Sequence, residues 1–235
     1  NLSHECIGDV DMRFCAVSDL HGNISLVPKI TSYARKLRCE FIVFCGDLTD
    51  FGTVDEGIEV LRMFSKSGLK MLYVPGNCDP RELVHVKVEG AVCIHGKLIY
   101  MDDVGFIGVG GSSTTPFNTP FELDENEIWN LLRNAVSGVK DFSRIVLVSH
   151  DPPNNTALDL TFAGLHVGSK SVREFILKYR PLMGIHGHIH EGRGVDKLNG
   201  VPIINPGASI NGYVAIVNIE KDAKIAYRLL NIFSD

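Results

Sequence analysis

The chain has 235 residues, of which 45% are hydrophobic, so it can bury a core and is not a disordered chain; we expect a single domain over residues 1–235. Its net charge of −5 and pI near 6.0 provide no basic stripe, so we expect no long nucleic acid as a partner. No apolar run approaches the ~18 residues that span a bilayer, so we expect no membrane partner.

Strand and helix patterns alternate in the first part of the chain. Apolar runs predict strands at 14–18, 41–45 and 71–74, and apolar residues spaced three to four apart predict helices at 26–37 and 54–64 between them. This order of strand, helix and strand implies parallel strands joined by right-handed crossovers.

The middle and end of the chain provide the strands and helices of a second layer. Asp124 with Glu127, and Ser171 with Glu174, have the spacing of a capping box and predict the starts of two more helices. Short apolar runs predict further strands at 91–94, 97–101, 105–109, 145–149, 182–186, 194–198, 201–204, 213–219 and 224–230. These strands are enough for a second sheet packed on the first.

Two stretches, 110–121 and 151–168, have weak regular signals. Long loops inside a compact domain are often functional, so we expect both to contact the substrate. Two phenylalanines, Phe117 and Phe121, flank small polar residues in the first of them. We expect both rings to pack beneath the loop rather than to stack on a base.

Seven side chains that can ligate a metal follow predicted strands. They are Asp19, His21, Asp47, Asn77, His150, His188 and His190. In open α/β sheets, the loops at the carboxyl ends of parallel strands form the binding crevice. We therefore expect the seven side chains to meet at one edge.

Carboxylate, imidazole and amide oxygen in this mixture suit a pair of divalent metal ions. Asp47 has two oxygens and can bridge both ions. Two divalent ions, two aspartates and a bridging hydroxide leave one positive charge, which attracts an anionic phosphate ester. Such a pair can also ionise water near neutral pH. We favour manganese, and iron, zinc and nickel suit the same ligands.

The ordered motifs Asp-x-His, Gly-Asp-x-x-Asp, Gly-Asn-x-Asp, His and Gly-His-x-His, between Asp19 and His190, resemble the calcineurin-like metallophosphoesterase superfamily. Asn205-Pro206-Gly207 is similar to a turn of that family. The resemblance implies a four-layer α/β/β/α sandwich of two mixed sheets and a dinuclear site. One ion would be held by Asp19, His21, Asp47 and His190, and the other by Asp47, Asn77, His150 and His188.

The residue after Asn77 departs from the best-known family pattern. Many members have a histidine there, thought to assist leaving-group protonation, whereas this chain has Cys78, as a small prokaryotic phosphodiesterase branch of the family does. The Cys78 thiol is a weak candidate for this proton donor. Alternatively, Cys78 has no catalytic role and is only a small residue beside the ions. His166, from the second loop, is the alternative proton donor. Asp50 and Asp79 are expected to orient loops without touching metal.

The cysteines show no CxxC spacing, which favours free thiols in a reducing cytoplasm. They are Cys6, Cys15, Cys39, Cys45, Cys78 and Cys93. The first residues also lack the pattern of a signal peptide, so we expect a cytoplasmic protein.

The sequence thus predicts a metal-dependent phosphodiesterase, using in-line attack by a hydroxide that bridges two metal ions on a small-molecule or nucleotide-type phosphodiester. One alternative is a phosphomonoesterase, such as a nucleotidase or protein phosphatase, for which Cys78 is a poor acid. The other is a non-catalytic scaffold of the same fold, which would have no obvious need for all seven ligands.

Overall fold

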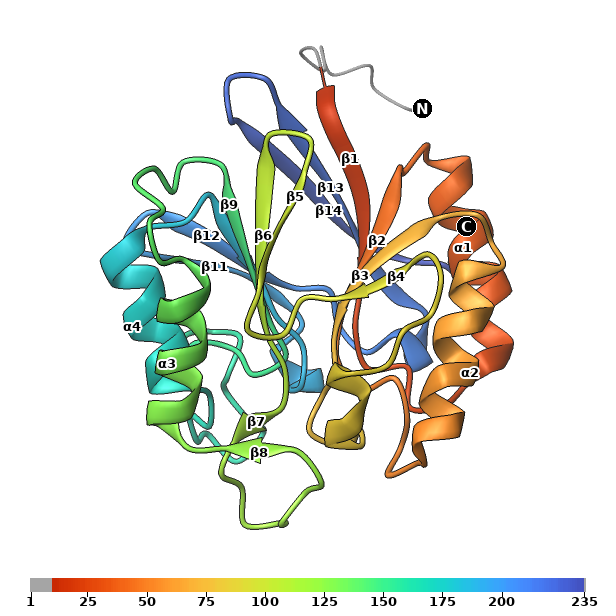
Figure 1. Ribbon diagram of the computed structural model, residues 1–235, viewed down its shortest axis with the longest axis horizontal. Helices are drawn as coiled ribbons and strands as arrows, with labels where there is room; N and C mark the ends of the chain where they lie inside the picture. Colours follow the sequence, from red (N-terminus) through yellow and green to blue (C-terminus); the bar gives the residue numbers. More distant parts are fainter. Residues whose placement is uncertain (1–9, 235) are drawn as a thin grey trace.

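The computed structural model describes residues 10–234. Two six-stranded sheets pack face to face and helices cover both outer faces, which confirms the predicted α/β/β/α sandwich (Figure 1). No helix of the described part is long and apolar enough to cross a membrane.

The first sheet, sheet A, has its parallel strands at the centre. Its strand order is β14 (Ile225–Asn231), β13 (Tyr213–Glu220), β1 (Val10–Val17), β2 (Phe41–Cys45), β3 (Lys70–Val74) and β4 (Ala91–Cys93). β1, β2 and β3 are parallel, as predicted, and α1 (Val27–Lys36) and α2 (Val54–Ser65) pack on the outer face.

The second sheet, sheet B, is built in the same way. Its strand order is β11 (Gly194–Leu198), β12 (Val201–Asn205), β10 (Met183–Ile185), β9 (Ile145–Ser149), β6 (Val104–Val109) and β5 (Leu98–Met101). β6, β9, β10 and β12 are parallel neighbours, and α3 (Glu125–Ala135) and α4 (Lys170–Tyr179) cover the outer face.

The space between the sheets is filled by side chains that alternate along the strands. Phe14 and Phe41 point inward, whereas Cys15 and Ile42 point outward to the helices. The Phe14, Phe41 and Phe106 rings pack with centroids 5.2–5.5 Å apart, so they join the two sheets. Because both faces of these strands are buried, their sequences are nearly continuous apolar runs.

The helix starts confirm one capping prediction and correct another. The Asp124 carboxylate accepts the N–H of Glu127, and the Glu127 carboxylate accepts the N–H of Asp124, so α3 begins with the predicted capping box. α4 instead begins after Ser169, and Ser171 lies inside the helix. The carboxylate of Glu125, from α3, accepts the Ser171 N–H at 2.8 Å. The local cap is therefore Ser169, whose hydroxyl accepts the N–H of Val172, and the tertiary contact from Glu125 adds to it.

The loop 110–121 differs in part from the prediction. Phe121 is 1% exposed and packs as expected, whereas Phe117 is 79% exposed, which contradicts the predicted packing of that ring. The loop begins with β7 (Ser112–Ser113), which pairs with β8 (Glu122–Leu123) at its end, so both ends are ordered by a short ladder.

Short 3-10 segments complete the described chain: η1 (Ile24–Leu26), η2 (Arg81–Val84), η3 (His190–Gly192) and η4 (Ser209–Asn211). The five cysteines of the described residues are free thiols, as expected, and Cys6 lies outside them. A cytoplasmic location stays a prediction.

Candidate metal centre

The seven predicted ligands all follow the carboxyl ends of strands. Asp19 and His21 follow β1, Asp47 follows β2 and Asn77 follows β3. The remaining three, which come from sheet B, are His150, His188 and His190. Both sheets present these ends at the same side of the sandwich (Figure 1). The distances between ligand atoms show that the seven side chains come together there.

The first group of candidate ligands consists of Asp19, His21 and His190, whose ligand atoms lie within 4.8 Å of one another. The two imidazole Nε2 atoms are 3.1 Å apart, and the Nε2 of His190 is 3.6 Å from Asp19 Oδ1. Two nitrogens that each lie ~2.1 Å from one ion at a right angle would be about 3 Å apart. The spacing therefore fits two ligands of one cation.

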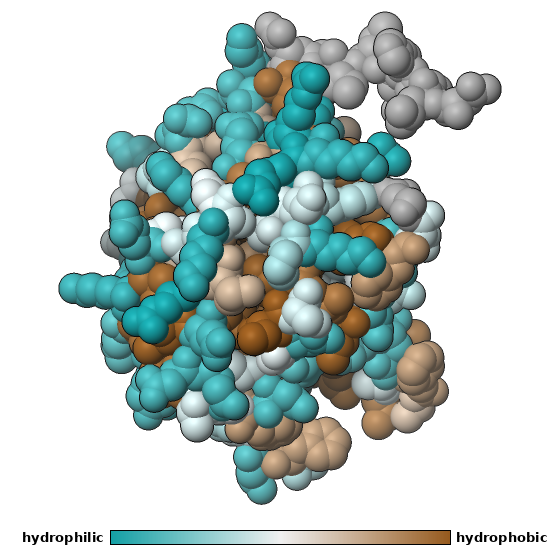
Figure 2. All heavy atoms as spheres, turned by 90° about the vertical axis from the view of Figure 1, so that its right-hand side faces the viewer, coloured by the Kyte–Doolittle hydropathy of each residue, from teal (hydrophilic) through white to brown (hydrophobic). Residues whose placement is uncertain are grey.

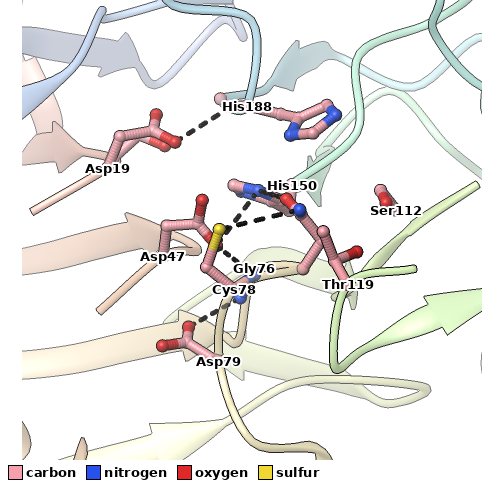
Figure 3. Close-up of polar contacts among 12 residues, drawn as sticks. Asp19, Asp47, Gly76, Cys78, Asp79, Ser112, Thr119, His150 and His188 are labelled. Carbon is pink, nitrogen blue, oxygen red and sulfur yellow. Dashed lines mark hydrogen bonds and ion pairs between the residues drawn. The ribbon is translucent and has the colours of Figure 1, made fainter. Parts of the chain in front are cut away.

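The second group consists of Asp47, His150 and His188, which also lie within 4.8 Å of one another. Asn77 joins them, since its Oδ1 is 2.9 Å from the Nε2 of His150. Figure 3 shows Asp47, His150 and His188 facing the same space from different elements, with Asp19 beside them.

Asp47 connects the two groups. Its Oδ2 is 3.8 Å from the Nε2 of His21, and its Oδ1 is 3.5 Å from the Nε2 of His150. The two oxygens of one carboxylate thus face different groups, which is the arrangement that a bridging ligand requires.

The charges of the site fit divalent cations. Asp19 and Asp47 are buried, and among the described residues their ion-pair partners are all histidines. Burial opposes ionisation of Asp47, but His150, His21 and His188 hold its pKa well below the ordinary value. Buried carboxylates with no lysine or arginine partner are costly, and a bound cation would provide the missing charge. The residues therefore fit the ions that the resemblance implies.

His150 and Asp47 form a coupled pair. Burial lowers the pKa of His150, but the neighbouring Asp47 carboxylate more than reverses this and raises it to about 10. A proton on His150 thus balances the carboxylate, and a cation would take the place of that proton.

Hydrogen bonds to the backbone fix the ligands. The Nδ1 of His150 lies 2.7 Å from the carbonyl oxygen of Cys45, so it donates there and leaves Nε2 to face the site. Asp79 accepts from the N–H groups of Leu48, Thr49 and Gly76, which holds the loops around Asp47 and Asn77. Asp79 therefore orients loops, as predicted.

The backbone at the site is strained. Four of the seven predicted ligands have a positive φ: Asp19, His21, Asp47 and His188. A Cβ on Gly76 would lie 2.1 Å from Asp47 Oδ1, and one on Gly187 would lie 1.8 Å from Ser18 Oγ. Only glycine permits these approaches, and strain of this kind is concentrated at functional sites.

The two predicted proton donors differ in their placement. Cys78 is 8% exposed and its N–H donates to Asp47 Oδ1 at 2.9 Å. Its thiol also lies within 4.8 Å of ligand atoms of His21 and Asp50. His166 is not among the side chains that cluster with the seven ligands in the described part of the chain. Its Nδ1 lies 2.7 Å from an Asp159 oxygen in the same loop.

The sequence reasoning missed Asp151 as a residue of the site. Its Oδ2 accepts from the N–H and hydroxyl of Ser113 at 2.8 and 2.7 Å, while its Oδ1 is buried without a hydrogen-bond partner in the described part of the chain. Burial raises its pKa to about 7. Asp151 thus ties the loop 110–121 to the residue after His150. The signal was present, since an acid directly follows a predicted ligand.

Comparisons with known proteins agree with this geometry. A profile described as calcineurin-like phosphoesterase matches residues 12–192. The uncharacterized protein MJ1162 of Methanocaldococcus jannaschii is 38% identical over 201 residues, which are 83% of this chain and 88% of that protein.

Two solved structures share the fold. TT1561 of Thermus thermophilus matches with a TM-score of 0.70 at 19% identity, covering 94% of this chain and 99% of that chain. A structure described as a novel archaeal phosphodiesterase matches with a TM-score of 0.51 at 16% identity, covering 93% and 100%.

Proposed function

The chain belongs to the calcineurin-like phosphoesterase family of metal-dependent phosphoester hydrolases, and we propose that it is a phosphodiesterase with a dinuclear site. The observation that carries the proposal is the position of Asp47, whose two oxygens face two separate groups of ligands. One carboxylate shared in this way indicates two adjacent cations rather than one.

The proposed ligand sets follow the geometry. Asp19, His21 and His190 would hold one ion, and Asn77, His150 and His188 the other, with Asp47 shared. When bound, two divalent ions would supply an ionised water near neutral pH and positive charge opposite the phosphoryl oxygens. We propose manganese first, because the donors are imidazole, carboxylate and amide oxygen.

The protein's own residues provide orientation. The bond from His150 Nδ1 to the Cys45 carbonyl keeps the ring in one tautomer and aims Nε2 at the site. The Asp47 carboxylate is held by the N–H of Cys78, so its Oδ1 cannot rotate away. Burial of these groups excludes competing water, which strengthens their attraction for charge.

Two features favour a diester over a monoester. Cys78 occupies the position after Asn77, and a thiol is a weaker hydrogen-bond donor and acid than an imidazolium. With Asp19 and Asp47 as the charged ligands and a hydroxide bound, a loaded site would carry about one net positive charge, which matches the single charge of a diester. The archaeal neighbour's description as a phosphodiesterase is consistent with this choice.

His166 stays our proposal for the group that protonates the leaving group. Asp159 accepts from its Nδ1, which leaves Nε2 for another partner. If His166 is the donor, His166→Gln should lower turnover of esters with poor leaving groups and remove the alkaline limb of the pH profile. Unchanged turnover across pH would remove His166 from the mechanism.

The proposal is tested with chromogenic esters. The manganese-loaded protein should cleave bis-p-nitrophenyl phosphate faster than p-nitrophenyl phosphate, and Asp47→Asn should abolish both activities. Asp222→Asn, on an exposed turn, is the matched control and should retain full activity. A preference for the monoester would favour the phosphomonoesterase alternative. Metal-replete protein that cleaves neither ester would favour the scaffold.

A further inference from the structure

Large apolar side chains are exposed on the loops beside the candidate site. Half of the twelve exposed large apolar residues in the described chain lie on the loops 46–53, 110–121 and 151–169. The most exposed are Phe51 (60%), Phe117 (79%), Phe162 (93%) and Leu165 (62%), which we call the apolar rim. Figure 1 shows these loops at the end of the sandwich where β1, β2 and β9 terminate.

Two rim residues lie one residue away from candidate ligands, through the chain or through a hydrogen bond. Phe51 follows Asp50, whose carboxylate oxygen lies 3.6 Å from the Nδ1 of His21. The N–H of Phe162 donates at 3.1 Å to the carboxylate of Glu191, the residue after His190.

The loop that carries Phe117 is connected to the second group of ligands. The N–H of Phe121 donates to the Asn77 carbonyl at 3.1 Å, and the other end of the loop is held by Asp151. Glu122, at the start of β8, accepts from the side chains of two threonines inside the loop, Thr115 and Thr119. The loop is therefore held by hydrogen bonds at both ends and in its middle, and Phe117 is exposed on an ordered loop.

The loop 151–169 is braced in a similar way. The buried carboxylate of Asp159 accepts from the N–H groups of Asn155, Thr156 and Gly168, and from His166. Phe162 and Leu165 thus extend from a loop that is held in place by hydrogen bonds. Leu160 and Val167, at 41% and 39% exposed, add aliphatic surface beside them.

The space-filling view agrees with an apolar rim. At the lower end of the molecule in Figure 2, pale brown side chains protrude on either side of a hollow. Scattered exposed apolar residues are ordinary, but a group on adjoining braced loops at a binding edge indicates a ligand.

We propose that the substrate is a phosphodiester bearing an aliphatic chain, which lies against the apolar rim while its phosphoryl group occupies the metal centre. The proposal rests on the proposed phosphodiesterase function. A ligand that contacts both features needs an anionic phosphate beside an apolar arm, and a long-chain alkyl or acyl phosphodiester has both.

An aliphatic chain suits the rim better than a nucleobase does. A nucleobase gains mainly by stacking flat on an aromatic face, whereas a flexible alkyl chain gains from aromatic and aliphatic surface alike. The rim mixes phenylalanine with aliphatic neighbours (Leu160, Leu165 and Val167), and the carboxylates of Asp159 and Glu122 are already used within their loops. Aliphatic surface gains from any apolar contact and requires no polar partners.

The test compares p-nitrophenyl alkyl phosphates with ethyl, butyl, hexyl and octyl arms and one with a thymidine arm. All release the same leaving group, so kcat/KM reports the arm alone. A half-buried methylene should raise kcat/KM about twofold, so the six extra methylenes of octyl should give an octyl to ethyl ratio of roughly 60. A thymidine arm that exceeds the octyl arm would overturn the proposal.

Two variants test whether the rim residues cause the preference for the octyl arm. The double variant Phe117→Ser/Phe162→Ser should reduce the octyl to ethyl ratio to below ~10, because it removes two of the apolar faces. Tyr100→Ser, an exposed aromatic on β5 at the far end of sheet B, is the matched control and should keep the wild-type ratio. An equal loss in both variants, or none in the double variant, would contradict the assignment of the rim. Urea unfolding midpoints show that each variant is folded.

A binding measurement separates this inference from the function beneath it. Calorimetry with ethyl and octyl methylphosphonates, which have no nitrophenyl leaving group, should show tighter binding and a more negative heat-capacity change for octyl. If every ester is cleaved at the same rate, the phosphodiesterase stands and the rim proposal fails. If no ester is cleaved, the proposed function fails, and the rim proposal then stands or falls on the octyl preference in calorimetry.

Discussion

Replacing Asn205 with alanine should weaken metal binding as well as the fold. Its Nδ2 donates to the carbonyl oxygens of Ile189 (2.9 Å) and Gly187 (3.3 Å), and its Oδ1 accepts the N–H of Gly207 at 2.8 Å. This side chain is 1% exposed and clamps the segment that carries His188 and His190. One residue thus positions a candidate ligand in each group.

The expected magnitudes follow from these bonds. Two of them have distances below 3.0 Å, and leaving buried partners unsatisfied costs about 1 to 3 kcal/mol each, so Asn205→Ala should lower the free energy of unfolding by about 3 kcal/mol. Residues that orient ligands typically change metal affinity about 10- to 100-fold. Urea unfolding of chelated protein and competition of manganese with a chelator measure the two effects separately.

The matched control is Asn218→Ala on β13, which removes a bond from the Arg13 Nε (2.7 Å) near the start of β1. It should lower stability by about 1 kcal/mol and leave manganese affinity unchanged. If Asn205→Ala loses stability as expected but binds manganese as tightly as the wild type, the argument that Asn205 positions the ligands is refuted.

Two further predictions concern the fold. Phe106→Ala should lower the free energy of unfolding in urea by about 3 to 5 kcal/mol, because the ring is fully buried between the sheets. Tyr100→Ala, at a residue that is 56% exposed, should change it by less than ~0.5 kcal/mol. Equal effects would contradict the packing described. His95 has its pKa lowered from 6.5 to about 4 by burial, with Arg81 and Lys97 adding to the effect, and its Nδ1 accepts the N–H of Gly110. The unfolded chain therefore binds more protons than the folded one, so the free energy of unfolding should fall by up to about 3 kcal/mol as pH drops from 6.5 to 4. The variant His95→Gln should show a flatter dependence on pH. An equally steep dependence in the variant would show that His95 is not its source.

The position of the site was predictable because its ligands follow the strands that form the core. Phe41–Cys45 is buried on both faces, so its apolar run could be recognised, and Asp47 is the first acid beyond it. The parallel order of the first three strands then places Asp19, Asp47 and Asn77 at one edge without any knowledge of side-chain packing.

Features that depend on tertiary contacts could not be predicted in this way. Ser171 with Glu174 has the spacing of a capping box, but the hydroxyl of Ser169 caps α4, and Glu125 of a neighbouring helix accepts the N–H of Ser171. The exposure of Phe117 likewise depends on a loop held by side chains far away in the sequence.

The most direct test of the account is the anomalous scattering of manganese in a crystal of the loaded protein. We predict two peaks on either side of Asp47, one among Asp19, His21 and His190 and the other among Asn77, His150 and His188. A single peak, or a peak among His21, Asp50 and Cys78 in place of either, would contradict the two-ion site.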